Sequence, residues 1–101
     1  MEHKIFVLVD KNLSRAQQTV QTGHALLNFS NDWTSPKECD WSKMSLVILA
    51  VNGEDELKNW FDKLEYCVKS DFLEPYWNDR MTAIAAYGPT VHEQVKDLAL
   101  L

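Results

Sequence analysis

Cysteine is scarce in this sequence, with Cys39 and Cys67 as the only two. They stand too far apart for a paired metal-ligand motif, and a disulfide framework in so small a chain usually needs more cysteines. The three histidines are dispersed, and the sequence has no HExxH motif, glycine-rich phosphate loop or dinucleotide fingerprint. We therefore expect two unpaired thiols in a reducing compartment, no metal site and no cofactor.

Long apolar runs are also missing. No segment approaches the roughly 20 apolar residues that a membrane-spanning helix needs. The N-terminus leads into a strand-like apolar run without the basic and then apolar pattern of a signal segment. These absences predict a cytoplasmic protein that is neither secreted nor bound to a membrane.

Positive charge is in deficit. The chain has 10 lysines and arginines against 15 aspartates and glutamates, so its net charge is −5. A protein that holds nucleic acid through a broad basic surface needs the opposite balance, because neutralisation of phosphates dominates such binding. Any contact with RNA must therefore be local.

The rest of the composition is that of a folded domain. Hydrophobic residues make up 46% of the chain and charged residues 25%, which is close to the average of globular proteins. A chain of 101 residues is long enough for one hydrophobic core and too short for two. No internal repeat or linker divides it, so we expect a single domain over residues 1–101.

The pattern of apolar residues predicts an α/β domain with the element order βαβαββα. Strands are expected at residues 4–10, 44–51, 72–77 and 81–87, and helices at 15–28, after Asn52 and at 91–98. The nearly continuous apolar run at 44–51 indicates a central strand covered on both faces. Pro75 places the strand at 72–77 nearer the sheet edge.

The first predicted helix carries two stripes of side chains and is followed by a long loop. One stripe along it is apolar and is expected to pack on the sheet, because its members recur at helical spacing: Ala16, Val20, Gly23 and Leu27. An adjacent stripe with the same spacing carries hydrogen-bonding side chains: Gln17, Gln21, His24 and Asn28. The residues after the helix, 31–43, predict a loop anchored by Trp33 and Trp41.

The stretch 13–25 resembles the first-helix signature of the type 2 peptidyl-tRNA hydrolases, in which Met-Gly-Lys-Gly-Lys is followed by Ala-Gln-x-x-His-Ala. Gln21, His24 and Ala25 match this pattern. Thinner similarity extends over almost the whole chain, including the Asp79 region and the turn at 87–89. The resemblance implies a three-layer α/β/α domain around a four-stranded mixed sheet. It also implies hydrolysis of peptidyl-tRNA to recycle tRNA, with tRNA as partner and a homodimer as assembly.

This implied reaction needs an activated water, a stabilised oxyanion and an anchor for phosphate. His24 is the candidate to bind or activate water, since it alone on the polar stripe accepts a proton near neutral pH. A helix histidine bonded to the neighbouring backbone is the ordinary alternative. Gln21 would orient His24 or the substrate carbonyl, and Arg15, at a helix start that favours anions, would hold a tRNA phosphate.

Asp79 and Thr82 complete the set of candidates. They belong to the segment 78–82, which is all that stands here for the family's Asp-Ala-Gly-Arg-Thr segment and its following Pro-Gly loop, so this loop is shortened. Asp79 is expected to be catalytic and Thr82 to bind substrate, against the simpler role of capping a turn. Four aromatic residues are candidates for stacking on unpaired bases, although anchoring a core or loop is the commoner role: Trp33, Trp41, Tyr76 and Trp77.

Two positions depart from the family pattern, since Arg15 and Gln17 replace its two lysines. An arginine cannot substitute for a lysine that must give up a proton. Two alternatives therefore stay open beside the peptidyl-tRNA hydrolase. One is a non-catalytic member of the same fold that binds a protein partner or RNA. The other is an enzyme that acts on a different small amide or ester through His24.

Overall fold

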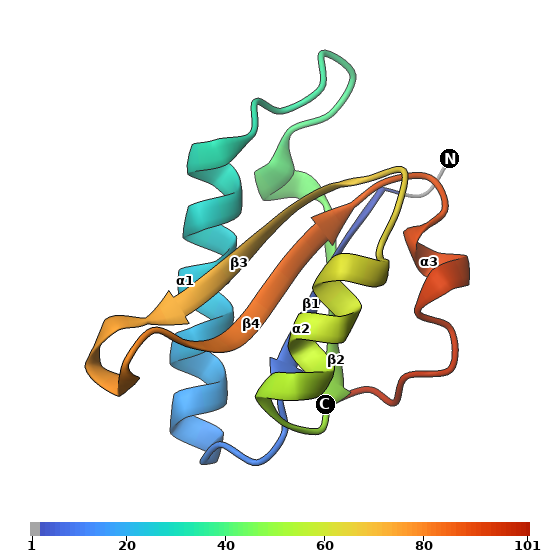
Figure 1. The fold of residues 1–101 in the computed structure, drawn as a ribbon. Helices are drawn as coiled ribbons and strands as arrows, with labels where there is room; N and C mark the ends of the chain where they lie inside the picture. Colours follow the sequence, from blue (N-terminus) through green and yellow to red (C-terminus); the bar gives the residue numbers. More distant parts are fainter. Residues whose placement is uncertain (1–2) are drawn as a thin grey trace.

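The computed structural model describes residues 3–101, which form one mixed sheet between helices (Figure 1). The strands are β1 (Lys4–Asp10), β2 (Ser45–Val51), β3 (Val68–Glu74) and β4 (Arg80–Tyr87). The helices are α1 (Arg15–Asp32), α2 (Gly53–Lys63) and α3 (Val91–Gln94), and two short 3₁₀ turns are η1 (Trp41–Lys43) and η2 (Pro75–Trp77). The predicted class and element order are confirmed.

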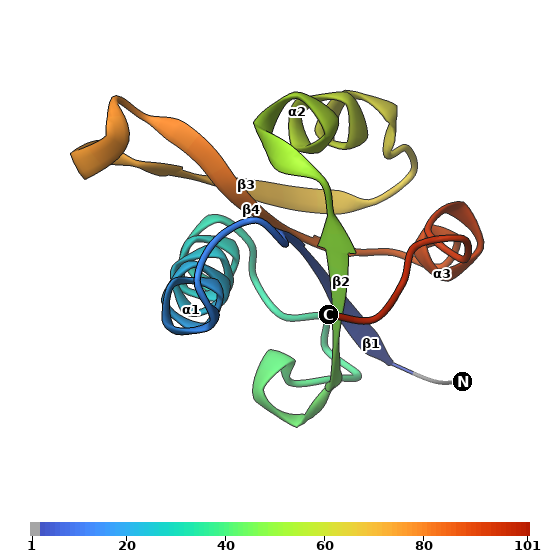
Figure 2. The same cartoon turned by 90° about the horizontal axis from the view of Figure 1, so that it is seen from below.

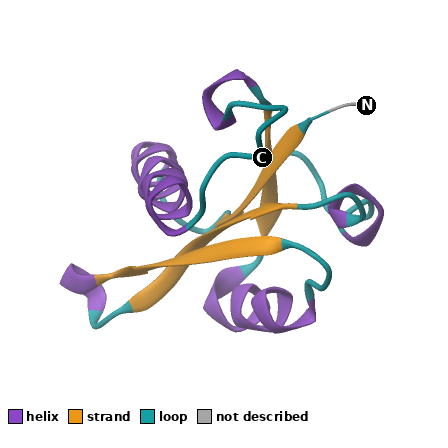
Figure 3. Cartoon of the chain, turned by 90° about the horizontal axis from the view of Figure 1, so that it is seen from above, coloured by secondary structure: helices purple, strands orange, loops and turns teal. Residues whose placement is uncertain are grey.

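The four strands lie in the order β2-β1-β4-β3. β1 is parallel to β2 and antiparallel to β4, and β3 and β4 form an antiparallel hairpin. Helix α1 lies on one side of the sheet and α2 on the other (Figure 2), and Figure 3 shows the strands enclosed between these helical layers. This arrangement is the three-layer α/β/α domain that the resemblance implies.

Successive side chains of β1 point to opposite faces of the sheet and pack into two separate hydrophobic cores. Val7 and Val9 face α1, where they meet Phe29, whereas Phe6 and Leu8 face the core shared by α2 and α3. In the middle of β4, the side chains that face α1 are the small ones of Ala83 and Ala85. Small residues at this position let the helix lie close to the sheet.

The strand predicted to be central, at 44–51, lies at an edge of the sheet, so this prediction was wrong. β2 pairs with no other strand than β1 in the described chain, and Leu46 near its start is 46% exposed. The chain's last residues cover part of the outer side: Ala50 N donates to Ala99 O at 2.8 Å and Leu101 N to Ile48 O at 3.0 Å. Only one face of β2 is buried, through Leu49 and Val51, so the expected cover on both faces was also wrong.

The other edge belongs to β3, as Pro75 predicted, but the strand is 68–74 rather than 72–77 and Pro75 begins η2 instead. The first helix continues to residue 32, four residues beyond the expected end. The last helix is only four residues long. Thr90 is its N-cap residue, and the Thr90 hydroxyl accepts a hydrogen bond from the Gln94 side chain rather than from a backbone amide of the first turn.

The loop after α1 is anchored by two tryptophans, as predicted. Trp33 Nε1 donates to Lys69 O at 3.1 Å and to Ser70 Oγ at 3.2 Å. The ring of Trp41 packs edge-on against Phe29 and Tyr87, each with centroids 5.0 Å apart. These rings hold the loop against the sheet.

Helix α1 turns a different face to the sheet from the one expected. The stripe predicted to be buried points to solvent: Leu27 is 69% exposed, and a Cβ added at Gly23 would meet no atom within 4 Å. The buried residues of α1 are Gln21, Thr22, Ala25 and Phe29. Burial of polar groups costs little when they are hydrogen-bonded, and this helix meets the sheet through two such groups as well as through Ala25 and Phe29.

The orientation of α1 predicts a contrast between two neighbouring residues. Phe29→Ala should lower the free energy of unfolding by about 3–5 kcal/mol, because it opens a cavity in the core. Leu27→Ala should change it by less than about 0.5 kcal/mol, because this side chain is mostly solvated. Urea unfolding followed by circular dichroism measures both, and a larger loss in Leu27→Ala would contradict this orientation.

Candidate functional site

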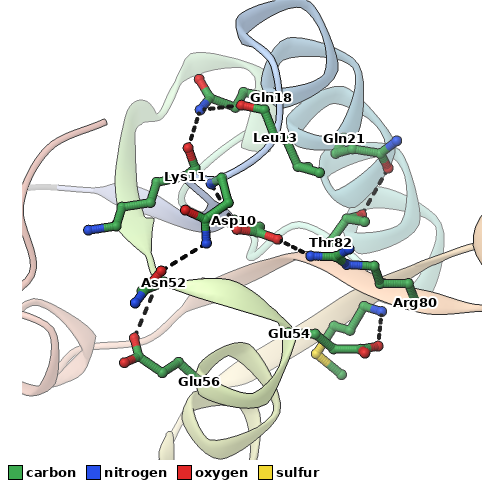
Figure 4. Close-up of polar contacts among 12 residues, drawn as sticks. Asp10, Lys11, Leu13, Gln18, Gln21, Asn52, Glu54, Glu56, Arg80 and Thr82 are labelled. Carbon is green, nitrogen blue, oxygen red and sulfur yellow. Dashed lines mark hydrogen bonds and ion pairs between the residues drawn. The ribbon is translucent and has the colours of Figure 1, made fainter.

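The candidate site lies at the carboxyl ends of the parallel strands β1 and β2, where α1 and α2 begin. Ligand sites of open α/β sheets commonly occupy this position. β4 runs in the opposite direction, so its first residue, Arg80, lies at the same end. Figure 4 shows polar side chains from these elements pointing toward one another. Four of the side chains labelled there, together with Glu74 at the end of β3, form what we call the inner polar cluster: Asp10, Gln21, Arg80, Thr82 and Glu74.

The first part of the inner polar cluster is an ion pair. Asp10 is fully buried, and its Oδ2 accepts a hydrogen bond from Arg80 Nη2 at 2.7 Å. Its Oδ1 accepts from Asn12 N at 2.9 Å. The Arg80 side chain is 41% exposed, whereas its Nε is buried and has no partner among residues 3–101. The guanidinium therefore connects a buried carboxylate with the solvent.

The second part is a network around the buried amide of Gln21. Thr82 Oγ1 donates to Gln21 Oε1 at 2.9 Å. Gln21 Nε2 donates to Glu74 Oε1 at 3.1 Å and to Gln17 Oε1 at 3.2 Å. The amide thus has partners for both its oxygen and its nitrogen, as a buried polar group requires.

An irregularity of the hairpin places Thr82 in this network. Ala83 pairs with Phe72 and Met81 pairs with Leu73, so Thr82 is an extra residue in β4 at a β-bulge. A bulge locally changes the direction of side chains and is frequent beside functional sites. Here it brings Thr82 and Ala83 to the face that α1 covers.

The connection between β1 and α1 is held by several hydrogen bonds. Gln18 Nε2 donates to Lys11 O and Leu13 O, each at 3.1 Å, and Ser14 Oγ caps the helix by accepting from Gln17 N. Asn12 Nδ2 donates to Asn52 Oδ1 at 2.8 Å, which ties this loop to the start of α2. Both helix starts are thereby fixed relative to the cluster.

The structure brings two of the five predicted site residues into direct contact, namely Gln21 and Thr82. His24 lies one helical turn beyond Gln21, and its ring stacks flat on Phe72 with centroids 4.5 Å apart and an interplanar angle of 9°. Its ring nitrogens have no hydrogen-bond partner in the part of the chain that the structure describes. They are free to meet water or a ligand.

Asp79 and Arg15 lie at the same end of the sheet but are exposed. Asp79 follows η2 with a left-handed φ of 56°, and its amide donates to Glu74 O at 3.0 Å. Arg15 is the first residue of α1 and has no ion-pair partner within residues 3–101. No hydrogen bond or ion pair in that range joins Asp79, Arg15 and His24 to one another.

Three members of the inner polar cluster escaped sequence reasoning: Asp10, Glu74 and Arg80. Asp10 and Arg80 resembled ordinary turn residues, and the chain separates them by 70 positions. The available signal was the position of the acids. Asp10 ends an apolar strand and Glu74 precedes Pro75, and acids are rarely buried unless they are paired.

Within residues 3–101, no three or more His, Cys, Asp and Glu side chains are grouped so that they can hold a metal ion. None of the helices in this range has the length and apolar character needed to cross a membrane.

The ion pair predicts that the two arginines of the chain differ in their effect on stability. Arg80→Gln should lower the free energy of unfolding by about 3 kcal/mol, because it leaves the buried Asp10 carboxylate without its cation. Arg15→Gln should change it by less than about 0.5 kcal/mol. Chemical denaturation measures both variants, and an equal effect of the two would show that the pair contributes nothing.

No family model matches the sequence, and no curated protein matches it significantly.

Proposed function

We propose that this protein hydrolyses the ester bond that joins a peptide to the 3′ end of tRNA. The observation that carries the proposal is the contact between Gln21 and Thr82. These two expected substrate-binding residues are 61 positions apart in the chain and share a buried hydrogen bond of 2.9 Å. Both side chains are fully buried, so their bond supports the site from behind: it fixes α1, which carries His24, against β4.

His24 binds and activates the attacking water in this proposal. Stacking on Phe72 fixes the plane of the imidazole ring without using its nitrogens. A ring nitrogen that is free of protein partners can accept a proton from water as the water attacks the ester carbon. Asp79 is the second proposed catalytic group, and its backbone bond to Glu74 attaches it to the network that contains Gln21.

Arg15 binds a phosphate of the tRNA end. The first turn of α1 contains no acidic residue, whereas the first turn of α2 contains three. The N-terminal end of α1 therefore keeps its attraction for an external anion, and Arg15 adds a full charge beside it. Because the net charge of the chain is −5, we expect few phosphate contacts and a weak dependence of binding on salt.

A second candidate function is the binding of RNA or a protein partner without chemistry. One observation favours it: in the described chain, no hydrogen bond or ion pair connects His24 with Asp79. A site that only binds does not need these two groups to act on the same atom. The net negative charge favours this candidate as well.

The proposal predicts release of free tRNA from an N-acetylated aminoacyl-tRNA by the purified protein. His24→Ala should lower kcat by about 10²–10⁴-fold, because the general base is lost. His92→Ala is the matched control, since His92 lies on α3 against Phe6 and outside the proposed site. Arg15→Gln should raise KM more than it lowers kcat. Separation of charged and free tRNA on acidic gels measures the reaction.

Thermal unfolding curves verify that each variant is folded. Binding of the acylated tRNA without its hydrolysis by the folded parent would contradict the enzyme and support the second candidate. If the His24→Ala variant still hydrolyses the substrate, the proposed activity would stand but His24 would not be the general base.

A further inference from the structure

A second group of reactive side chains lies at the opposite end of the sheet from the inner polar cluster. His3 precedes β1, Tyr87 ends β4, and Cys39 belongs to the loop between α1 and η1 (Figure 1). None of them takes part in the proposed hydrolysis.

The three side chains are in mutual contact. Cys39 Sγ lies 3.4 Å from His3 Nδ1, and the same nitrogen lies 3.4 Å from the Tyr87 hydroxyl. The distance from Cys39 Sγ to the Tyr87 hydroxyl is 3.9 Å. A thiol and an imidazole at this separation form the nucleophile and base of many cysteine sites.

The thiol and the imidazole also line a cavity of about 500 Å³. Four charged residues share its wall, and the two lysines offset the two acids: Lys37, Glu38, Asp40 and Lys43. Oδ1 of Asp40 already accepts two hydrogen bonds from Ser42. A cavity with balanced charge has no strong preference for an ion, so it fits a small uncharged ligand.

Tyr87 supports the reactivity of this thiol. Burial, together with its hydrogen bond to Cys39 and nearby acidic charge, raises the pKa of the Tyr87 hydroxyl. The phenol therefore keeps its proton near neutral pH and can donate a hydrogen bond to a thiolate. A nearby donor and a nearby base both favour the reactive form of a cysteine.

Cys67 is a natural reference within the same chain. Like Cys39 it is partly buried and outside any disulfide. No histidine within residues 3–101 forms a hydrogen bond with it, and burial raises the pKa of its thiol despite the charge of Lys69. Buried thiols without a base react slowly.

We propose that Cys39 is a modification site for small uncharged carbon electrophiles, with His3 as its proton acceptor. The thiol proton passes to His3 Nδ1, and the sulfur electron pair forms a bond to the electrophilic carbon. When that carbon bears a leaving group, its bond to this group breaks and the group departs with the electron pair. The product is a thioether at Cys39.

Iodoacetamide tests the proposal on the intact, folded protein, with both cysteines followed by mass spectrometry of their peptides. At neutral pH, Cys39 should react about tenfold faster than Cys67. His3→Asn should slow Cys39 about fivefold or more, because the base is lost, and should leave Cys67 unchanged. His92→Asn is the matched control and should leave both rates unchanged.

Equal rates at the two cysteines would overturn the proposal, and so would an unchanged Cys39 rate in His3→Asn. Circular dichroism checks that the variant is folded. Tyr87→Phe provides a second probe, because it keeps the aromatic ring that packs on Trp41 and removes only the hydroxyl. It should also slow Cys39, and a rate equal to that of the parent would count against the assigned cluster.

Discussion

The burial of the Asp10 carboxylate constrains the whole end of the molecule where the helices begin. A carboxylate with no solvent exposure is stable only when hydrogen bonds and an opposite charge replace its water. Arg80 provides the charge and so fixes the start of β4, while Asn12 provides an amide and so fixes the loop before α1. Asn12 in turn holds Asn52. One buried group thereby coordinates three segments that are distant in sequence.

The sequence was sufficient to predict the elements and their order, because strands and helices leave different periodicities. It was insufficient to predict which face of a helix is buried or where a strand lies in the sheet, because tertiary contacts determine both. The apolar stripe of α1 that contains Leu27 faces solvent, since Gln21 and Asn28 find partners on the sheet and compensate for their own burial. The strand at 44–51 appeared central because the final residues of the chain supply part of the cover that a neighbouring strand would give.

The candidate site, too, could be predicted from the sequence only in part. Gln21 and Thr82 were identified from a family resemblance, and the structure joins them. His24 was identified in the same way, but its stacking on Phe72 depends on where β3 lies beside α1, which no local pattern states. Asp10 and Arg80 were invisible as a pair, because a partner 70 positions away cannot be recognised from the spacing of either residue.

Hydrogen bonds to the two edge strands of the sheet affect how molecules of this protein associate at high concentration. On β3, the carbonyl oxygens of Lys69 and Asp71 already accept hydrogen bonds from the side chains of Trp33 and Asn28. On β2, the backbone at Ile48 and Ala50 is engaged by the last three residues. Unpaired strand edges are templates on which other chains add strands and aggregate. Because these groups are occupied, the two sheet edges offer fewer backbone groups to which a strand of another molecule can add.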